Sequence, residues 1–316
     1  MRIGVDLGGT KIAIVVLDAE GDSVHTDRVA TPHQDYGATL LAIVRLIQEA
    51  EAKVGTRCTI GIGTPGAISP ATGRMKNCNS TWLNDRSLQQ DLESKLGSRS
   101  IRLANDANCF ALSEAVDGSA AGCSLVFGVI LGTGVGGGLA LQAQPWIGPN
   151  AIGGEWGHNP LPAPQGDELP GPSCYCGRSG CIETFLSGPG LERLHLERTG
   201  QEQSGREIAA AAERAELADS GQSNPDSTGH REDRAALETL SIYEDRLARA
   251  LGTVVNLLDP DCIVLGGGLS AISRLYTQIP RIWGRYIFSD RVDTPLRAPR
   301  FGDASGVRGA AWLWGR

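Results

Sequence analysis

The sequence lacks the features that mark several broad classes of protein. Its 316 residues carry a net charge of −7 and contain no basic run, which argues against a nucleic-acid-binding surface. No stretch approaches the about 20 apolar residues that a membrane-spanning helix needs. The N-terminus, MRIGVDLGG, has no apolar core of signal-peptide length behind its arginine. We therefore expect a cytoplasmic protein with no nucleic-acid partner and no membrane partner.

The common nucleotide-binding signatures are absent as well. No G-x-x-x-x-G-K-[ST] loop is present, and no G-x-G-x-x-G opens a helix after a predicted strand. Disulfides are also not expected, because they are rare in the cytoplasm. Five of the eight cysteines stand alone, mostly among apolar neighbours, and are read as buried free thiols: Cys58, Cys78, Cys109, Cys123 and Cys262.

Glycine is abundant, with 42 residues, and it clusters in three turns at the ends of predicted strands. The turns are DLGGTK near the start, GTGVGGG at 132–138, and LGGG at 265–268. Any one of them could be a simple hairpin, but glycines also let backbone N–H groups cradle phosphate oxygens. Asp6 adds a carboxylate suited to hydrated Mg²⁺, and Thr10 and Lys11 add a hydroxyl and a cation. Together the turns favour a nucleotide.

Strands and helices alternate along the chain, once before about residue 120 and once after. This pattern suggests two related α/β halves that face a cleft. The segment 146–172 is rich in Gly and Pro and predicts an irregular loop, while the polar segment 216–233 has no predicted conformation. Strands are expected within residues 2–31 and at 59–64, 101–106, 124–131, 138–142 and 262–266, and helices at 36–54, 87–96, 107–116, 234–258 and 305–314.

Two polar residues, Asn105 and Asp106, lie where a predicted strand gives way to a helix. Asn and Asp often cap the first turn of a helix, and the local sequence favours that role over catalysis. A carboxylate at the end of a strand can also serve as a general base. Both roles stay open at this point.

The remaining cysteines, Cys174, Cys176 and Cys181, fall within eight positions, and His158 precedes them in GGEWGHNP. One histidine and three cysteines make a tetrahedral set suited to zinc. The spacing H-x15-C-x-C-x4-C is not the usual C-x2-C finger, so composition alone leaves other readings open. Disulfide pairing among the three cysteines would leave one over.

Five segments in this order, DLGGTK, LANDANC, LGTGVGGG, GEWGHNPL and CYCGRSGCIET, resemble the sugar kinases of the ROK family (repressors, open reading frames, kinases). The whole chain is most similar to bacterial fructokinases that also accept mannose. The resemblance implies an α/β, two-domain, actin-like (ribonuclease-H-like) fold with a cleft between the domains. The expected domains are 1–118, joined by the C-terminal helix at 303–316, and 119–302. The implied cofactors are ATP, Mg²⁺ and a structural zinc, and the implied assembly is a homodimer.

The resemblance also implies a role for particular residues. Asp106 matches the catalytic base, and Asn105 orients the sugar beside it. The expected sugar ligands are Glu155, His158 and Glu183, completed by Gly66 and Asn79, and the histidine uses its second ring nitrogen. The expected zinc ligands are His158, Cys174, Cys176 and Cys181. The expected ATP contacts are Asp6, Gly8, Gly9, Thr10, Lys11, Gly132, Thr133, Gly134, Gly136, Gly267 and Gly268.

The function expected from this resemblance is ATP-dependent phosphorylation of fructose to fructose 6-phosphate. A kinase for N-acetylglucosamine, glucosamine or glucose is the alternative, because the same loops serve those sugars. A sugar-responsive repressor is a further alternative from the same family. It is disfavoured because the first predicted strand begins at Ile3 and leaves no room for a helix-turn-helix. A sugar-binding protein without catalysis is disfavoured by Asp106 and the glycine turns.

Overall fold

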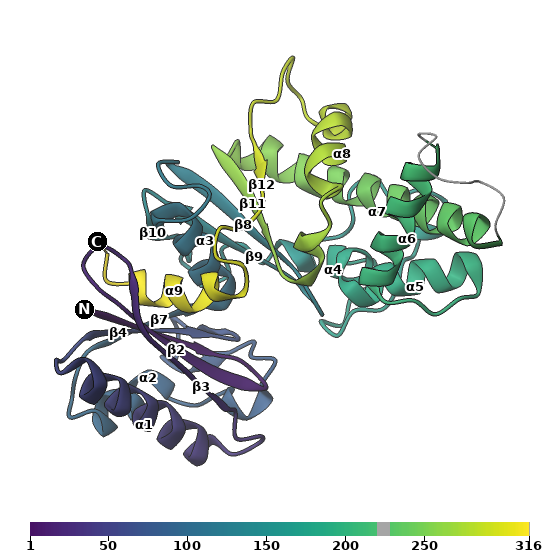
Figure 1. Cartoon of the computed structure of the whole chain (residues 1–316). Coiled ribbons are helices and arrows are strands. Elements are labelled where there is room, and N and C mark those ends of the chain that lie inside the picture. Colours follow the sequence, from purple (N-terminus) through teal and green to yellow (C-terminus); the bar gives the residue numbers. More distant parts are fainter. Residues whose placement is uncertain (220–227, 316) are drawn as a thin grey trace. The chain divides into compact units, whose positions relative to one another are not determined.

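The computed structural model describes residues 1–219 and 228–315, in which strands and helices alternate (Figure 1). The strands are β1 Arg2–Leu7, β2 Lys11–Leu17, β3 Ser23–Ala30, β4 Thr59–Thr64, β5 Ala67–Ile68, β6 Met75–Lys76, β7 Ile101–Asn105, β8 Leu125–Leu131, β9 Val135–Leu141, β10 Gln144–Pro145, β11 Cys262–Gly266 and β12 Leu296–Arg297. The helices are α1 Tyr36–Val54, α2 Leu88–Lys95, α3 Asp106–Val116, α4 Ile182–Leu186, α5 Gly188–Thr199, α6 Gly205–Asp219, α7 Thr228–Leu258, α8 Leu275–Ile282 and α9 Ser305–Trp312. Short 3₁₀ turns are η1 Thr81–Leu83, η2 Trp156–His158, η3 Gly166–Glu168, η4 Gly268–Ala271, η5 Trp283–Tyr286 and η6 Gly302–Ala304.

The chain divides into two compact units. Unit 1 comprises Met1–Gly128, Gly137–Gly154 and Pro299–Arg316, and unit 2 comprises Val129–Gly136 and Glu155–Ala298. These bounds follow the contacts within the chain and differ from the expected domains at 1–118 and 119–302. The domain assignment itself stays a prediction.

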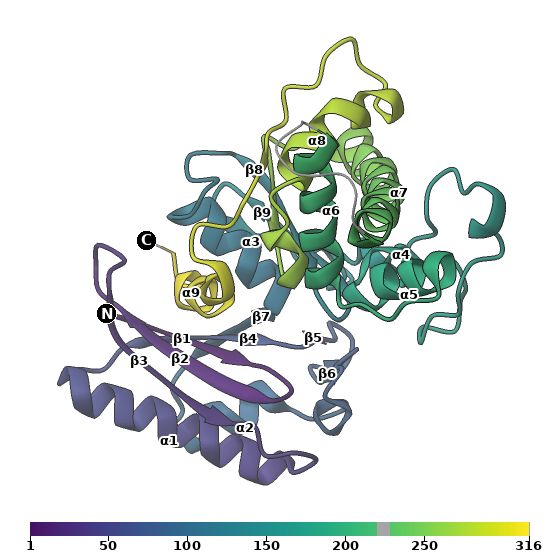
Figure 2. The same cartoon turned by 45° about the vertical axis from the view of Figure 1, so that its right-hand side comes forward.

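Unit 1 is built on a sheet of order β3-β2-β1-β4-β7, in which β1, β4 and β7 are parallel. Helices α1 and α2 cover one face and α9 the other (Figure 2). Gly4 of β1 lies beside Gly61 of β4. A Cβ at Gly4 would overlap the Val307 carbonyl oxygen, and one at Gly61 would overlap that of Ala310. The two glycines therefore let the backbone of α9 lie directly on the sheet.

The C-terminal segment is held to this first sheet by hydrogen bonds with residues of β1, β4 and β7. Arg2 Nε donates to the Gly315 carbonyl at 3.1 Å, and Arg102 Nη1 donates to that of Leu313 at 2.6 Å. In the reverse direction, Trp314 Nε1 donates to the Ile60 carbonyl at 2.7 Å. The two ends of the sequence thus stabilise one unit.

A second sheet has the order β10-β9-β8-β11-β12, and unit 2 carries its strands β11 and β12 together with helices α4 to α8. Its longest helix, α7, buries an apolar face that includes Ala236, Leu240, Leu247 and Leu251. These positions recur at intervals of four and seven residues, which places them on one side of the helix. Helix α6 packs along α7, and ion pairs at 2.5 and 2.6 Å join their exposed faces.

Most predicted elements are confirmed, and helix α1 has the predicted bounds of 36–54. Two differences fall in the polar region after residue 200. Helix α6 was not predicted there, although Ile208, Ala211, Ala212 and Ala215 give it a buried face. Helix α7 begins at Thr228 rather than at residue 234. Residues 220–227 of the polar segment lie outside the described residues.

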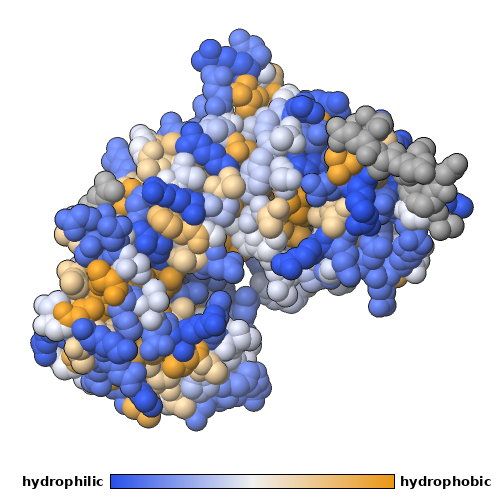
Figure 3. All heavy atoms as spheres, in the orientation of Figure 1, coloured by the Kyte–Doolittle hydropathy of each residue, from blue (hydrophilic) through white to orange (hydrophobic). Residues whose placement is uncertain are grey.

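The surface shown in Figure 3 is largely hydrophilic, with apolar residues scattered in small groups. Among residues 1–219 and 228–315, every helix is too short or too polar to cross a bilayer. The long helix α7 is amphipathic, but its buried side also carries the charged residues Glu244, Arg246 and Arg249.

Candidate active site

In unit 1 three of the expected site residues gather at one edge of the sheet. Strands β1, β4 and β7 are parallel neighbours, so their carboxyl ends meet there. The register pairs Asp6 with Gly63, and Thr64 with Asn105, and Asp106 follows directly. Carboxyl ends of parallel strands are the usual ligand-binding edge of an α/β sheet. The structure therefore brings Asp6, Asn105 and Asp106 together.

The cap of helix α3 is shared between the two polar residues at its start. Asn105 is the N-cap residue, and its Oδ1 accepts from Ala107 N at 2.9 Å. Asp106 occupies the first helical position, and its Oδ1 accepts from the same N–H at 2.7 Å. Both side chains therefore accept from the same N–H group at the start of α3.

Both carboxylates act on a buried thiol at this edge. Burial, followed by the charges of Asp106 and Asp6, raises the pKa of Cys109 well above the ordinary value. Burial also raises the pKa of Asp6, and the nearby Lys11 only partly offsets this rise. Two acidic groups thus share a water-poor edge, where a metal cation or the proton of a substrate hydroxyl is stabilised.

The turn after β1 has the form of a tight hairpin with an exposed tip. Gly8 N donates to the Lys11 carbonyl at 3.0 Å, and Thr31 Oγ1 donates to the Gly8 carbonyl at 2.7 Å. Gly9, Thr10 and Lys11 are exposed. A Cβ at Gly9 would lie 3.5 Å from Ser80 Oγ, so the hairpin adjoins the loop that carries the exposed Asn79.

Close contacts with neighbouring atoms require a glycine at position 66. A Cβ there would lie 2.5 Å from the Lys76 carbonyl oxygen and 2.6 Å from Cys78 Sγ. The glycine therefore lets β5 lie against the segment that begins at β6. Asn84 braces the same segment, because its Oδ1 accepts from Cys78 N at 2.9 Å. This contact beside Asn79 was not predicted.

In unit 2 the turn between β8 and β9 is bound to an expected sugar ligand. Glu183 Oε2 accepts from Val135 N at 3.0 Å. A Cβ at Gly134 would lie 2.6 Å from the same oxygen, whereas one at Gly132 would meet no atom within 4 Å. The turn thus has one glycine pressed against a carboxylate and another beside open space.

The glycines after β11 differ in the same way. Gly267 has a φ of +79°, and a Cβ on it would lie 2.5 Å from the Leu131 carbonyl oxygen at the end of β8. A Cβ at Gly268 would meet no atom within 4 Å. Gly267 is therefore required by the backbone, and the space beside Gly268 and Gly132 is free for a ligand.

The turn η2, which ends at His158, is held against the start of β9. Trp156 is buried, and its Nε1 donates to the Gly136 carbonyl at 2.9 Å. A Cβ at Gly157 would overlap the Val135 carbonyl oxygen. Only glycine permits this approach, so the EWGH sequence places Glu155 and His158 on a backbone that is fixed by β9.

Backbone pairing then brings the cysteines to His158. The bridge between Pro160 and Cys181 is antiparallel, and Ile182 N donates to the Asn159 carbonyl at 2.8 Å. A short hairpin is closed by the bond from Cys174 N to the Arg178 carbonyl at 2.8 Å. The four expected ligand side chains, His158, Cys174, Cys176 and Cys181, offer atoms that all lie within 4.8 Å of one another.

The geometry of this cluster fits zinc. Tetrahedral zinc with Zn–S of about 2.3 Å and Zn–N of about 2.05 Å requires S···S and S···N separations of about 3.8 and 3.6 Å. Cys176 Sγ and Cys181 Sγ lie 3.7 Å apart, and Cys174 Sγ lies 3.6 Å from His158 Nδ1. Hydrogen bonds from Arg178 lower the pKa of Cys176 to about 6, which favours the thiolate that zinc binds.

The second ring nitrogen of His158 has a partner within unit 2. His158 Nε2 lies 2.9 Å from the hydroxyl of Tyr175, whose ring meets the imidazole edge-on at 5.1 Å. The predicted contact of this nitrogen with a sugar therefore competes with Tyr175, a residue that sequence reasoning missed. Burial, followed by the charge of Glu183, raises the pKa of Tyr175 to about 12, so the hydroxyl stays protonated.

Comparisons with known proteins identify the family of the chain. The model of the ROK family matches residues 2–316. The chain belongs to the ROK family. It is 39% identical over 317 residues to an N-acetyl-D-glucosamine kinase of Salmonella paratyphi A, and the match covers 99% of each protein. It resembles the crystal structure of a ROK hexokinase from Thermus thermophilus with a TM-score of 0.79 and 30% identity, covering 99% of this chain and 97% of that one.

A ROK family glucokinase from Streptomyces griseus, in complex with glucose and AMPPNP, is similar with a TM-score of 0.74 and 27% identity, covering 99% of this chain and 98% of that one. The likeness over nearly the whole chain identifies the two-domain, actin-like α/β fold that the sequence predicted. The comparisons do not support fructose as the sugar, because the relative at 39% identity is an N-acetyl-D-glucosamine kinase.

Proposed function

We propose that the chain is an ATP-dependent hexose kinase that phosphorylates the 6-hydroxyl of N-acetylglucosamine. The choice of N-acetylglucosamine as the sugar rests on the 39% identity to an N-acetyl-D-glucosamine kinase over 99% of both proteins. N-acetylglucosamine was the expected alternative to fructose. Glucose is the second candidate, because a similar structure of 27% identity is a glucokinase in complex with glucose.

Asp106 is the proposed general base. Its carboxylate accepts the proton of the attacking hydroxyl while that oxygen forms a bond to the γ-phosphorus and the bond from phosphorus to the leaving oxygen of ADP breaks. This role requires a carboxylate at the ligand-binding edge of the sheet, where Asp106 stands beside Asp6 and Asn105. Most of the rate enhancement in phosphoryl transfer comes from positioning and charge stabilisation rather than from covalent chemistry.

The phosphates are proposed to lie against three turns. The hairpin of Gly8, Gly9, Thr10 and Lys11 has an exposed tip, and Gly132 and Gly268 border open space. Backbone N–H groups in such turns bind phosphate oxygens. Asp6 supplies a carboxylate oxygen of the kind that hydrated Mg²⁺ prefers, and Mg²⁺ with ATP would neutralise charge on the phosphates.

The zinc is proposed to be structural, held by His158, Cys174, Cys176 and Cys181 with no open coordination position. Glu183 lies two residues beyond Cys181, in the first turn of α4, and Glu155 lies three residues before His158. A fixed cluster therefore fixes both carboxylates, which accept hydrogen bonds from sugar hydroxyls. The expected homodimer stays a prediction.

The change Asp106→Asn tests the assignment of the base. Asparagine retains the shape but cannot take a proton, so kcat should fall by about 10² to 10⁴ while the KM for the sugar changes less than about tenfold. Asp35→Asn is a matched control, since Asp35 caps helix α1 by accepting from Ala38 N at 2.9 Å. The control should keep kcat. Equal kcat in both variants and the parent would show that Asp106 only caps its helix.

A further inference from the structure

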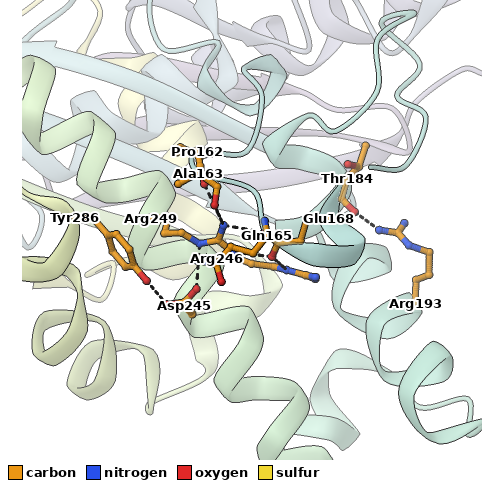
Figure 4. A network of polar contacts seen from close by, with 10 residues as sticks. All are labelled: Pro162, Ala163, Gln165, Glu168, Thr184, Arg193, Asp245, Arg246, Arg249 and Tyr286. Atoms are coloured by element: carbon orange, nitrogen blue, oxygen red, sulfur yellow. Dashed lines mark hydrogen bonds and ion pairs between the residues drawn. The ribbon is translucent and has the colours of Figure 1, made fainter. Parts of the chain in front are cut away.

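A buried cluster of three charged residues in unit 2 has no part in the site described so far. Glu168 belongs to η3, and Arg246 and Arg249 belong to α7 (Figure 4). Glu168 Oε1 accepts from Arg246 Nε at 2.8 Å and from Arg249 Nη2 at 2.6 Å, and its Oε2 accepts from Arg249 Nη1 at 2.9 Å. The three side chains are only 5%, 7% and 3% exposed. Charged groups buried to this extent are stable only when they are paired and hydrogen-bonded in good geometry.

This charged cluster holds the middle of the loop that joins His158 to Cys174, two of the proposed zinc ligands. Fifteen residues separate His158 from Cys174, and five of them are prolines, which cannot donate backbone hydrogen bonds. Arg249 Nη1 also donates to the carbonyls of Pro162 and Ala163 at 3.1 and 2.8 Å. One arginine therefore ties the loop at two places, through Glu168 and through the carbonyls near Pro162.

The same face of α7 also holds the far side of the zinc cluster. Tyr243, Arg246 and Arg249 follow one another at intervals of three residues, so they share one side of the helix. Tyr243 donates its hydroxyl to the Leu186 carbonyl at 2.9 Å, and the Arg246 guanidinium lies 5.0 Å from the centre of the Phe185 ring. Phe185 and Leu186 belong to α4, the helix that begins after Cys181.

The hydrogen bonds to Glu168 lower the pKa of its carboxyl. Burial alone would raise the pKa of this carboxyl, but hydrogen bonds from Arg249 and Arg246 and from Gln165 N outweigh it and lower the pKa to about 2. The carboxylate therefore stays charged at neutral pH, and every bond it accepts is charge-assisted.

We propose that Glu168, Arg246 and Arg249 are positioning residues that hold the loop 159–173 in the shape that zinc binding and sugar binding require. The inference rests on the proposed function for its sugar, but its zinc part stands on the loop alone. Without the anchor, zinc must itself order a loop of about 15 residues, and closing such a loop corresponds to a factor of about 100 in an equilibrium constant.

Zinc affinity is the first readout, measured by competition with a chromophoric chelator on the full chain. Glu168→Gln should raise the zinc Kd by about tenfold to 100-fold. It should also raise the KM for N-acetylglucosamine by about tenfold, with kcat within about threefold and the KM for ATP unchanged. A residue that only stabilised the fold would not produce this split between the two KM values.

A matched control exists in unit 1. Arg99 binds Glu51 in the same forked manner, at 2.9 and 2.8 Å, and also donates to the Cys58 carbonyl at 2.6 Å. Glu51→Gln removes a comparable charge from a comparable pair that is far from the zinc ligands in sequence. It should lower stability while leaving the zinc Kd and both KM values unchanged.

A second variant covers the case in which Glu168→Gln does not fold. Replacing a buried set of ions by apolar residues of similar size often leaves stability unchanged or increased. The triple variant Glu168→Leu, Arg246→Met and Arg249→Met should therefore fold, yet it should bind zinc about tenfold or more weakly, because the bonds to the Pro162 and Ala163 carbonyls are lost.

The outcomes separate the inference from the proposed function. A parental zinc Kd in a folded Glu168→Gln or triple variant would overturn the inference, and so would a parent protein that binds no zinc. Equal losses of zinc affinity in Glu168→Gln and Glu51→Gln would also overturn it, because they would indicate general destabilisation. If the parent protein phosphorylates no hexose, the proposed function fails, while the zinc measurements still decide the role of the cluster.

Discussion

Gly134→Ala is expected to damage the sugar site, although the sequence assigned Gly134 to ATP. The added Cβ would lie 2.6 Å from Glu183 Oε2, closer than such atoms approach in proteins, so the carboxylate must move. That movement lengthens or breaks the 3.0 Å bond from Val135 N. Gly134 does not have a positive φ, so the contact with Glu183 decides the effect rather than backbone strain.

The size of the effect follows from the bond that is lost. A hydrogen bond to a charged group contributes about 1.5 to 3 kcal/mol, which corresponds to a rise of about tenfold to 100-fold in the KM for the sugar. Gly132→Ala, two residues away, is the matched comparison. Its Cβ would enter open space that we assign to phosphate, so it should raise the KM for ATP instead.

Steady-state kinetics with each substrate varied in turn would measure both KM values for the two variants. The reasoning predicts opposite patterns, with the sugar KM raised in Gly134→Ala and the ATP KM raised in Gly132→Ala. A Gly134→Ala enzyme with a normal sugar KM would refute the proposed role of Glu183. A Gly132→Ala enzyme with a normal ATP KM would refute the assignment of this turn to phosphate.

Three further predictions concern the metal, the pH dependence and the fold. Cys176→Ser should lose the one zinc that metal analysis finds per chain, because serine hardly ionises at neutral pH, whereas Cys123→Ser should keep it. Glu168→Gln should lower the free energy of unfolding by about 3 kcal/mol at pH 7. Because the folded-state pKa of Glu168 is lowered to about 2, this difference should persist above pH of about 4.5 and shrink as the pH falls towards 2, as denaturant titrations at several pH values would check. Gly61→Ala should lower the free energy of unfolding by about 3 kcal/mol or more, because its Cβ would overlap the backbone of α9. Gly284→Ala, whose Cβ would meet no atom within 4 Å, should change it by less than about 0.5 kcal/mol in the same titrations.

Local patterns were sufficient to predict much of the fold. The apolar residues of 36–54 recur at helical spacing, and Asp35 and Gly55 cap the helix at its two ends. The clustering of His158 with Cys174, Cys176 and Cys181 was expected from the resemblance to the ROK family, whereas the spacing alone left other readings open. Helix α6 was missed because its buried face consists mainly of alanines, which give a weak apolar signal.

Contacts between distant segments could not be predicted from local patterns. Nothing in the sequence near Glu168 indicates that Arg246 and Arg249, about 80 positions later, neutralise it. The role of Gly134 depends on Glu183, 49 positions away, and a glycine in a turn gives no sign of what its missing side chain avoids. The only local indication of these ion pairs was that Arg246 and Arg249 lie beside apolar positions of a long helix.

The central claim is that the chain transfers phosphate from ATP to N-acetylglucosamine. ADP release from the purified chain with N-acetylglucosamine, glucosamine, glucose, mannose and fructose tests it most directly. Release should depend on the sugar, with the highest kcat/KM for N-acetylglucosamine and at least about tenfold less for fructose. The highest kcat/KM for fructose, or no release above background with any of the five sugars, would contradict it.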